Sequence, residues 1–195
     1  MRSLQPLLAS LSARLRRRAS RQLMGRAGAA CLLGLALCAS PIARADTVAE
    51  YRLKAAFLFN FASFTEWPDS LGDTLTVCVH GEDPFGASLD GIAGKPIGKR
   101  TTAVRRTLSA DGLNGCDVVF VTQPVISNLP RIFDQLAQRP VLVVADSPGA
   151  TQRGVMLNME TSGGKVSFAA NLSAARRHGL NLSARLLSLA TEVIQ

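Results

Sequence analysis

Two short apolar segments, CDVVFV at residues 116–121 and VLVVA at residues 141–145, decide the fold of this chain. Both are nearly unbroken apolar runs, which is typical of strands covered on both faces in a parallel sheet. Between them, residues 127–138 place apolar side chains at helical spacing: Leu129, Ile132, Phe133 and Leu136. The sequence therefore predicts a β-α-β crossover in the middle of the chain.

Strand and helix signals alternate on both sides of this crossover. Further strands are expected at residues 75–80, 101–108, 155–160 and 165–169, and the last two are joined by the hairpin signal Thr161-Ser162-Gly163-Gly164. Helices are expected at residues 47–64, 173–178 and 183–194. This order predicts one α/β domain, a three-layer sandwich with a mixed, mostly parallel sheet and helices on both faces.

Two helix predictions are more specific, and the first concerns a further helix after residue 83. Asp83 is expected to be the N-cap of a helix that has Pro84 at its first position, after the strand at residues 75–80. The final helix is expected to run from Ser183 to Ile194 and to face inward with its apolar positions: Leu186, Leu187, Ala190, Val193 and Ile194.

The first 45 residues have the pattern of a secretory signal peptide. An arginine-rich stretch is followed by the apolar segment AGAACLLGLALCA at residues 27–39 and by Ala43-Arg44-Ala45, so cleavage is expected after Ala45. Met24 would open a signal of ordinary length, which makes it an alternative start. An organelle transit peptide and twin-arginine export are the rival interpretations. The mature domain would then be residues 46–195.

The positive charge of the chain lies almost wholly in this leader. The whole chain has a formal net charge of +8, with 22 Lys and Arg against 14 Asp and Glu. Residues 1–45 hold eight arginines and no acidic residue, which leaves residues 46–195 with 14 basic and 14 acidic residues. A surface that follows a phosphate backbone needs a net basic stripe, so nucleic acid is excluded as a partner.

Export also bears on the cysteines. Cys31 and Cys38 would leave with the leader, and Cys78 and Cys116 would remain in an oxidising compartment. They form either one disulfide or two buried free thiols.

Motifs for catalysis and metal binding are missing from the sequence. The loop Gly81–Gly86 has neither dinucleotide nor P-loop spacing, and the two histidines, His80 and His178, form no local metal pattern with Cys or carboxylate. The cluster Arg176-Arg177-His178 is either a favourable helix C-terminus or an anion or nucleotide pocket, with Arg176 and His178 as candidate ligand-binding residues.

Several motifs in order resemble the YfiR-like family of periplasmic proteins. The resemblance covers almost the whole mature chain and rests on YRLKAAFL at residues 51–58, TEWP at 65–68, GEDPFG at 81–86, CDVVFV at 116–121, VLVVAD at 141–146 and the closing NL, AAR, GL and LLSLA motifs between 171 and 190.

This resemblance implies a periplasmic, non-enzymatic regulator without a cofactor, usually a homodimer. Such a protein binds the sensory domain of a membrane-bound diguanylate cyclase and represses cyclic di-GMP synthesis, which limits biofilm formation. An outer-membrane lipoprotein is a further partner in relatives. Cys78 and Cys116 match cysteine positions of the family, and no cysteine follows Cys116, so a second disulfide of relatives is absent.

Binding a partner protein requires exposed apolar side chains. The candidates lie on the first helix of the mature chain and on the Gly81–Gly86 loop: Tyr51, Phe57, Phe61, Trp67 and Phe85. The alternative function is a periplasmic small-molecule receptor for a nucleotide or an amino acid, or an enzyme, built on the loops at the strand ends. Its polar groups would be Asp83, Asp146, Arg176 and His178.

Overall fold

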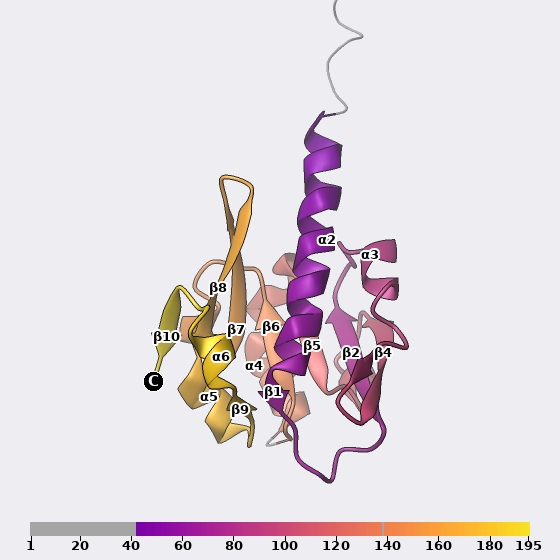
Figure 1. The fold of residues 1–195 in the computed structure, drawn as a ribbon, viewed down its shortest axis with the longest axis vertical. Coiled ribbons are helices and arrows are strands. Elements are labelled where there is room, and N and C mark those ends of the chain that lie inside the picture. The colour runs from indigo at the N-terminus through magenta and orange to yellow at the C-terminus, as the bar shows by residue number, and fades with distance from the viewer. Residues whose placement is uncertain (1–41, 138) are drawn as a thin grey trace, which may run out of the picture. The chain divides into compact units, whose positions relative to one another are not determined.

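The computed structural model describes residues 42–137 and 139–195 (Figure 1). Residues 45–195 form one unit, separate from residues 1–44. The expected signal peptide lies almost entirely outside the described residues, so its cleavage after Ala45 stays a prediction.

The centre of the unit is an eight-stranded mixed sheet with the strand order β10-β8-β7-β6-β5-β2-β4-β3. Five consecutive strands, from β7 to β4, run parallel to one another, whereas β8 and β3 run antiparallel to their neighbours β7 and β4. The strands are β2 (Thr74–His80), β3 (Pro96–Ile97), β4 (Arg100–Thr107), β5 (Val118–Val121), β6 (Leu142–Ala145), β7 (Leu157–Ser162), β8 (Lys165–Asn171) and β10 (Glu192–Ile194). A two-stranded sheet pairs β1 (Thr65–Glu66) with β9 (Asn181–Leu182).

Helices cover both faces of this sheet, as the sequence predicts. In Figure 1 the long helix α2 crosses in front of the strands, and α4 lies behind them. The helices are α2 (Ile42–Ser63), α3 (Ala87–Asp90), α4 (Leu129–Leu136), α5 (Leu172–Arg177) and α6 (Ala184–Leu187). Short 3₁₀ helices follow β4, β5 and β6: η1 (Asp111–Leu113), η2 (Gln123–Asn128) and η3 (Thr151–Arg153).

The two segments that decide the fold are the centre of the core. Every residue of β5 and β6 is fully buried, which confirms the prediction of strands covered on both faces. Helix α2 adds an aromatic layer on one face, where the rings of Phe61 and Phe168 meet edge to face with centroids 4.9 Å apart.

The prediction of a long C-terminal helix is wrong. Helix α6 ends at Leu187, and Glu192–Ile194 is the edge strand β10, parallel to β8. Thr191 starts this strand, because both its backbone N–H and its hydroxyl donate to the carbonyl of Phe168. The β-branched pair Val193 and Ile194 suits the pleated edge better than a helix.

The predicted helix start at Asp83 is also wrong. Helix α3 begins at Ala87 with Gly86 as its N-cap, and Gly86 has a positive φ of 52°. Asp83 instead accepts a hydrogen bond from the backbone N–H of Phe85 and forms a 2.6 Å ion pair with Arg106. The Asp-Pro sequence therefore makes a turn that is fastened to β4, not a helix cap.

Candidate functional site

The carboxyl ends of the parallel strands meet at one edge of the sheet, which we call the carboxyl edge. It is formed by the loops that follow β2, β5 and β6: Gly81–Gly86, Thr122–Pro124 and Asp146–Gly149. β2 lies between β4 and β5, so the chain leaves β2 toward one side and later returns on the other. Such a change of direction opens a crevice between strand ends, and open α/β sheets bind ligands there.

A buried charged network fastens α2 to this edge. The ammonium group of Lys54 lies 2.7 Å from Asp146 Oδ2 and 2.6 Å from Glu50 Oε1. Tyr51 donates its hydroxyl to the same Asp146 oxygen at 3.0 Å. The side chains of Lys54 and Asp146 are only 5% and 4% exposed. A buried charge needs such partners, so this network holds the N-terminal half of α2 in place.

The network perturbs two pKa values. Burial, followed by the charge and hydrogen bond of Asp146, raises the pKa of Tyr51 far above its ordinary value, so its hydroxyl remains a donor. Burial alone would raise the pKa of Glu50, but hydrogen bonds from Lys54 and Thr161 outweigh it and lower that pKa. Glu50 is therefore ionised near neutral pH.

Two adjacent clefts open along the carboxyl edge. The larger, with a volume of about 580 Å³, is lined by residues of α2, of the loop after β6 and of the β7–β8 hairpin, including Glu50, Lys54, Asp146, Ser147 and Glu160. The smaller, of about 280 Å³, lies at the β2–β5 crevice and is lined by Glu82, Asp83, Pro84, Thr122 and Pro124. Tyr51 and Gln123 line both clefts, so the two are neighbours.

Two buried hydroxyl groups at this edge lack a partner. Thr122 and Ser147 are each 2% exposed, and neither hydroxyl has a hydrogen-bond partner among the residues that the structure describes. Each residue lines one of the two clefts. Buried polar groups are normally paired, so unpaired ones beside a cleft point to a group that the protein binds there.

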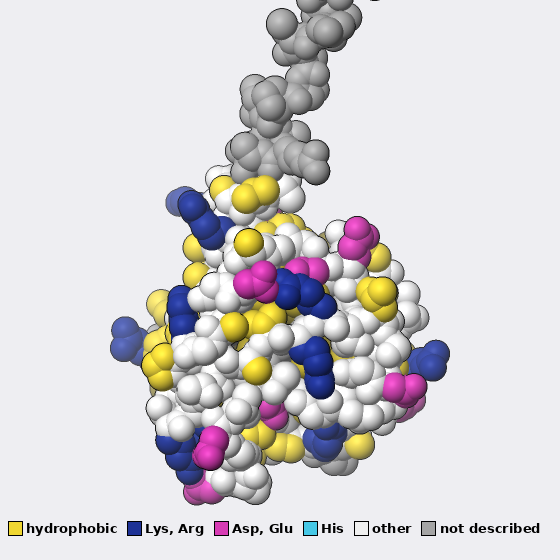
Figure 2. All heavy atoms as spheres, turned by 90° about the vertical axis from the view of Figure 1, so that its right-hand side faces the viewer, with side chains coloured by type: hydrophobic (Ala, Val, Ile, Leu, Met, Phe, Trp, Pro, Cys, Tyr) yellow, Lys and Arg dark blue, Asp and Glu magenta, His cyan; other side chains and the backbone are white. Residues whose placement is uncertain are grey.

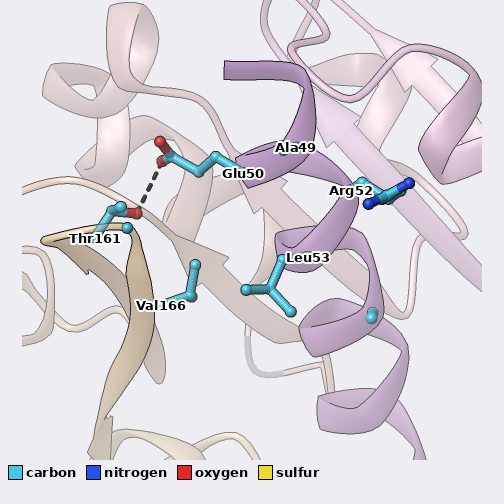
Figure 3. Close-up of a pocket in the computed structure, with 8 residues that line it drawn as sticks. Ala49, Glu50, Arg52, Leu53, Thr161 and Val166 are labelled. Atoms are coloured by element: carbon cyan, nitrogen blue, oxygen red, sulfur yellow. Dashed lines mark hydrogen bonds between the residues drawn. The ribbon is translucent and has the colours of Figure 1, made fainter. Parts of the chain in front are cut away.

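A third feature is a groove between α2 and the β7–β8 hairpin (Figure 3). Its volume is about 720 Å³, and Leu53 of α2 faces Val166 of β8 across it. A hydrogen bond of 2.8 Å from the Thr161 hydroxyl to Glu50 spans the groove. Leu53 is 42% exposed, so the groove offers apolar surface to a partner.

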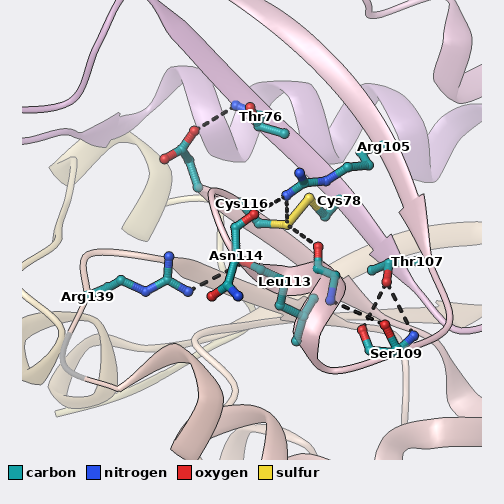
Figure 4. The surroundings of a disulfide bond; sticks show 11 residues. Thr76, Cys78, Arg105, Thr107, Ser109, Leu113, Asn114, Cys116 and Arg139 are labelled. Atoms are coloured by element: carbon teal, nitrogen blue, oxygen red, sulfur yellow. Dashed lines mark hydrogen bonds between the residues drawn. A yellow bond between two sulfur atoms is a disulfide. The ribbon is translucent and has the colours of Figure 1, made fainter.

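The two mature cysteines are joined in a disulfide between β2 and the amino-terminal end of β5 (Figure 4). Of the two possibilities that the sequence leaves open, the structure has the bond rather than free thiols. Cys78 of β2 and Cys116, just before β5, are both buried, and Arg105 Nη2 donates to Cys116 Sγ at 2.9 Å. The bond links two neighbouring strands of the core.

The predicted partner-binding residues differ in exposure. Phe61 and Phe85 are 1% and 4% exposed, so they belong to the core in this structure. Phe85 is enclosed by edge-to-face contacts with Tyr51 and Phe120, with centroids 5.3 and 4.8 Å apart. Tyr51, Phe57 and Trp67 are partly buried and pack against the core. Partner binding by any of them stays a prediction.

Of the four predicted polar groups, the structure brings together only two. Asp146 and Asp83 lie at the neighbouring clefts of the carboxyl edge. Arg176 and His178 lie at the end of α5, which follows β8. Because β8 runs antiparallel to β7, this helix is at the opposite edge of the sheet. There His178 Nδ1 is 3.4 Å from the carbonyl oxygen of Arg139, and neither residue lines the clefts described above. Ligand binding by Arg176 and His178 stays a prediction.

The role of Lys54 could not be predicted from the sequence. Lys54 lies on the first helix of the mature chain and is buried against Asp146, 92 residues away. Only a pattern of Lys or Glu on an otherwise apolar helix, opposite an Asp directly after a buried strand, could have suggested the pair. Asp146 itself follows the VLVVA strand, and that position favours a functional edge.

Residues 42–137 and 139–195 contain neither a metal-ligand cluster nor a membrane-spanning helix. No group of three or more His, Cys, Asp or Glu side chains in this range is placed to hold a metal ion. Nor does this part of the chain contain a helix with the length and apolar character needed to cross a membrane. Figure 2 shows basic and acidic side chains interspersed on the face that carries α3 and β4.

Fold and site together define an α/β domain with one internal disulfide and with two clefts along the carboxyl edge of a mostly parallel sheet. Residues 51–191 match the family described as DUF4154, YfiR/HmsC-like. The chain belongs to this family, as its sequence motifs predict.

Two solved structures resemble this chain, and the first of them shows a similar fold. A conserved domain protein from Vibrio cholerae O1 biovar El Tor strain N16961 has 12% identity and a TM-score of 0.51 over 73% of this chain and 60% of its own. The ABC domain from Streptococcus pneumonia in complex with L-Trp has 10% identity and a TM-score of 0.46 over 62% of this chain and 55% of its own. This chain therefore spans less than two thirds of either protein chain.

Proposed function

We propose that this protein is a non-enzymatic periplasmic regulator, which binds the sensory domain of an inner-membrane diguanylate cyclase and represses cyclic di-GMP synthesis. The observation that carries the proposal is membership of the YfiR/HmsC-like family over residues 51–191. The Cys78–Cys116 disulfide is consistent with an oxidising compartment outside the cytoplasm. A homodimer and an outer-membrane lipoprotein partner belong to the same proposal.

Repression of this kind needs no chemistry at the regulator. A regulator shifts the equilibrium of an enzyme only by the difference between its affinities for the inactive and the active state. What it needs is a surface that fits one of these states, with a few apolar side chains that become buried on binding.

The groove between α2 and the β7–β8 hairpin supplies such a surface. Its charged members are Glu50 and Arg52. The other residues that line it are mostly apolar or small: Ala49, Leu53, Ala56, Gly164 and Val166. Val48, on the same helix, is 63% exposed. We assign this groove to an apolar segment of the cyclase sensory domain.

The test combines a deletion with a pair of matched variants. Deleting the gene should raise cyclic di-GMP, and re-expression should lower it again. Leu53→Asp places a charge in the groove and should weaken capture of the cyclase from solubilised inner membrane about thirtyfold, the loss expected for an interface hot spot. Leu189→Asp changes a 63% exposed leucine that lines none of these sites, so it is the control.

Two results would contradict the proposal. Unchanged cyclic di-GMP in the deletion strain would exclude the cyclase as the target. Equal loss of capture in Leu53→Asp and Leu189→Asp, with both proteins folded, would exclude the groove as the docking surface.

A further inference from the structure

The carboxyl edge carries a feature that repression of a cyclase does not require. Its two clefts share Tyr51 and Gln123 and follow the strand ends from the β2–β5 crevice to the β7–β8 hairpin. With volumes of about 580 and 280 Å³, they have the size of a small-molecule site.

The charge of the larger cleft selects the class of ligand. Glu50, Asp146 and Glu160 line it, and Lys54 is its one basic residue. Lys54 is already paired with both Glu50 and Asp146, so negative charge is left over. Asp146 accepts from Lys54 and from Tyr51 on the same atom, Oδ2, which leaves its other oxygen for a further donor.

The smaller cleft adds to this negative potential. Glu82 and Asp83 line it. Asp83 forms an ion pair with Arg106 on β4, whereas Glu82 forms no ion pair among the described residues. Since both clefts are acidic, an anionic nucleotide would be repelled, whereas a protonated amine would be attracted.

The unpartnered hydroxyls are an independent sign of a ligand. Ser147 is 2% exposed in the larger cleft, and Thr122 is 2% exposed in the smaller, each with an oxygen that makes no hydrogen bond among the described residues. Neither belongs to the acidic group, so their unused hydrogen-bonding capacity is not explained by the charged network.

We propose that the clefts at the carboxyl edge bind a small organic cation, a primary amine or guanidinium compound, through Asp146, Glu50 and the Ser147 hydroxyl. Tyr51 lines both clefts, and the Lys54 ammonium 4.6 Å from its ring centroid shows that the ring already takes part in cation–π binding at this edge. The site does not depend on the proposed cyclase partner, and its test needs no cyclase.

The test is a calorimetric and thermal-shift titration of the purified full-length chain. The probes are 1,4-diaminobutane and arginine as cations, and glutamate as an anion of similar size. At least one cation should bind and raise the melting temperature, because a ligand that binds only the folded state stabilises it. Glutamate should do neither.

A pair of serine variants makes the test specific. Ser147→Ala removes a hydroxyl that has no partner in the described structure, so the melting temperature without ligand should not fall, while affinity for the cation should fall about tenfold, as expected for a hydrogen bond to a charged group. Ser70→Ala, the same change in an exposed loop, should leave the affinity unchanged.

A second pair tests the charge. Glu160→Gln should weaken cation binding, and the exposed Glu192→Gln on β10 should not. The proposal is overturned if neither cation binds at millimolar concentration, if glutamate binds as well as the cations, or if Ser147→Ala binds them with unchanged affinity.

Discussion

Reducing the Cys78–Cys116 disulfide should cost the protein a large part of its stability. The bond joins residues 38 apart in sequence and links β2 to the start of β5, two neighbouring strands of the sheet. Without the bond, the unfolded chain regains the conformations that this loop closure excludes. We expect the folded state to change little on reduction, because both cysteines are buried in the core.

The magnitude follows from the length of the loop. Closing a loop of 38 residues lowers the entropy of the unfolded chain by an amount worth about 4 kcal/mol at 25 °C. For a folded unit of this size, 1 kcal/mol corresponds to roughly 2–4 °C in the melting temperature. Reduction should therefore lower the melting temperature by about 8–16 °C.

Urea unfolding with and without a phosphine reductant measures this difference. The Cys78→Ala/Cys116→Ala double variant is the control, because it should be as unstable as the reduced protein and insensitive to the reductant. A difference below about 1 kcal/mol between oxidised and reduced protein would refute the reasoning, since loop closure would then contribute almost nothing.

Two further perturbations concern buried ionisable groups. Lys54→Met leaves the buried Asp146 without its cation and should lower the free energy of unfolding in urea at pH 7 by about 3–5 kcal/mol. The double variant Lys54→Met/Asp146→Leu removes both charges and should recover most of this loss. No recovery would contradict the ion-pair assignment. Burial lowers the pKa of His80, so the unfolded chain takes up this proton first as the pH falls. The free energy of unfolding should therefore decrease below about pH 6.5, the ordinary pKa of histidine, and level off below the folded pKa. In His80→Phe this decrease should vanish. If the decrease is unchanged in this variant, another titrating group causes it and the reasoning about His80 is wrong.

The sheet could be predicted because its strands are short apolar runs whose character depends on local sequence. β5 and β6 are buried on both faces, and no other element satisfies an unbroken apolar run of that length. The end of the C-terminal helix at Leu187 and the strand after it could not be predicted. The apolar spacing of residues 183–194 suits a continuous helix as well as it suits a short helix followed by a strand. A distant contact, the pairing of β10 with β8, decides the outcome there.

The candidate site could be predicted only in part for the same reason. Asp146 and Asp83 were expected at strand ends, since a strand end is a local feature. Glu50 and the buried Lys54 lie on a helix almost a hundred residues before Asp146, and only the packing of α2 across the sheet brings them to it. Arg176 and His178 do not lie near Asp146 and Asp83, because the β7–β8 hairpin reverses the chain direction and places α5 at the other edge of the sheet.

The groove and the larger cleft are not independent of each other. Glu50 and Thr161 line both, and the hydrogen bond between them forms part of the wall that the two share. A cation that draws the Glu50 carboxylate toward Asp146 competes with Thr161 for it, and a partner that separates the hairpin from α2 breaks the same bond. If both sites are occupied in the cell, occupation of one must therefore alter the affinity of the other, and by the same factor in each direction.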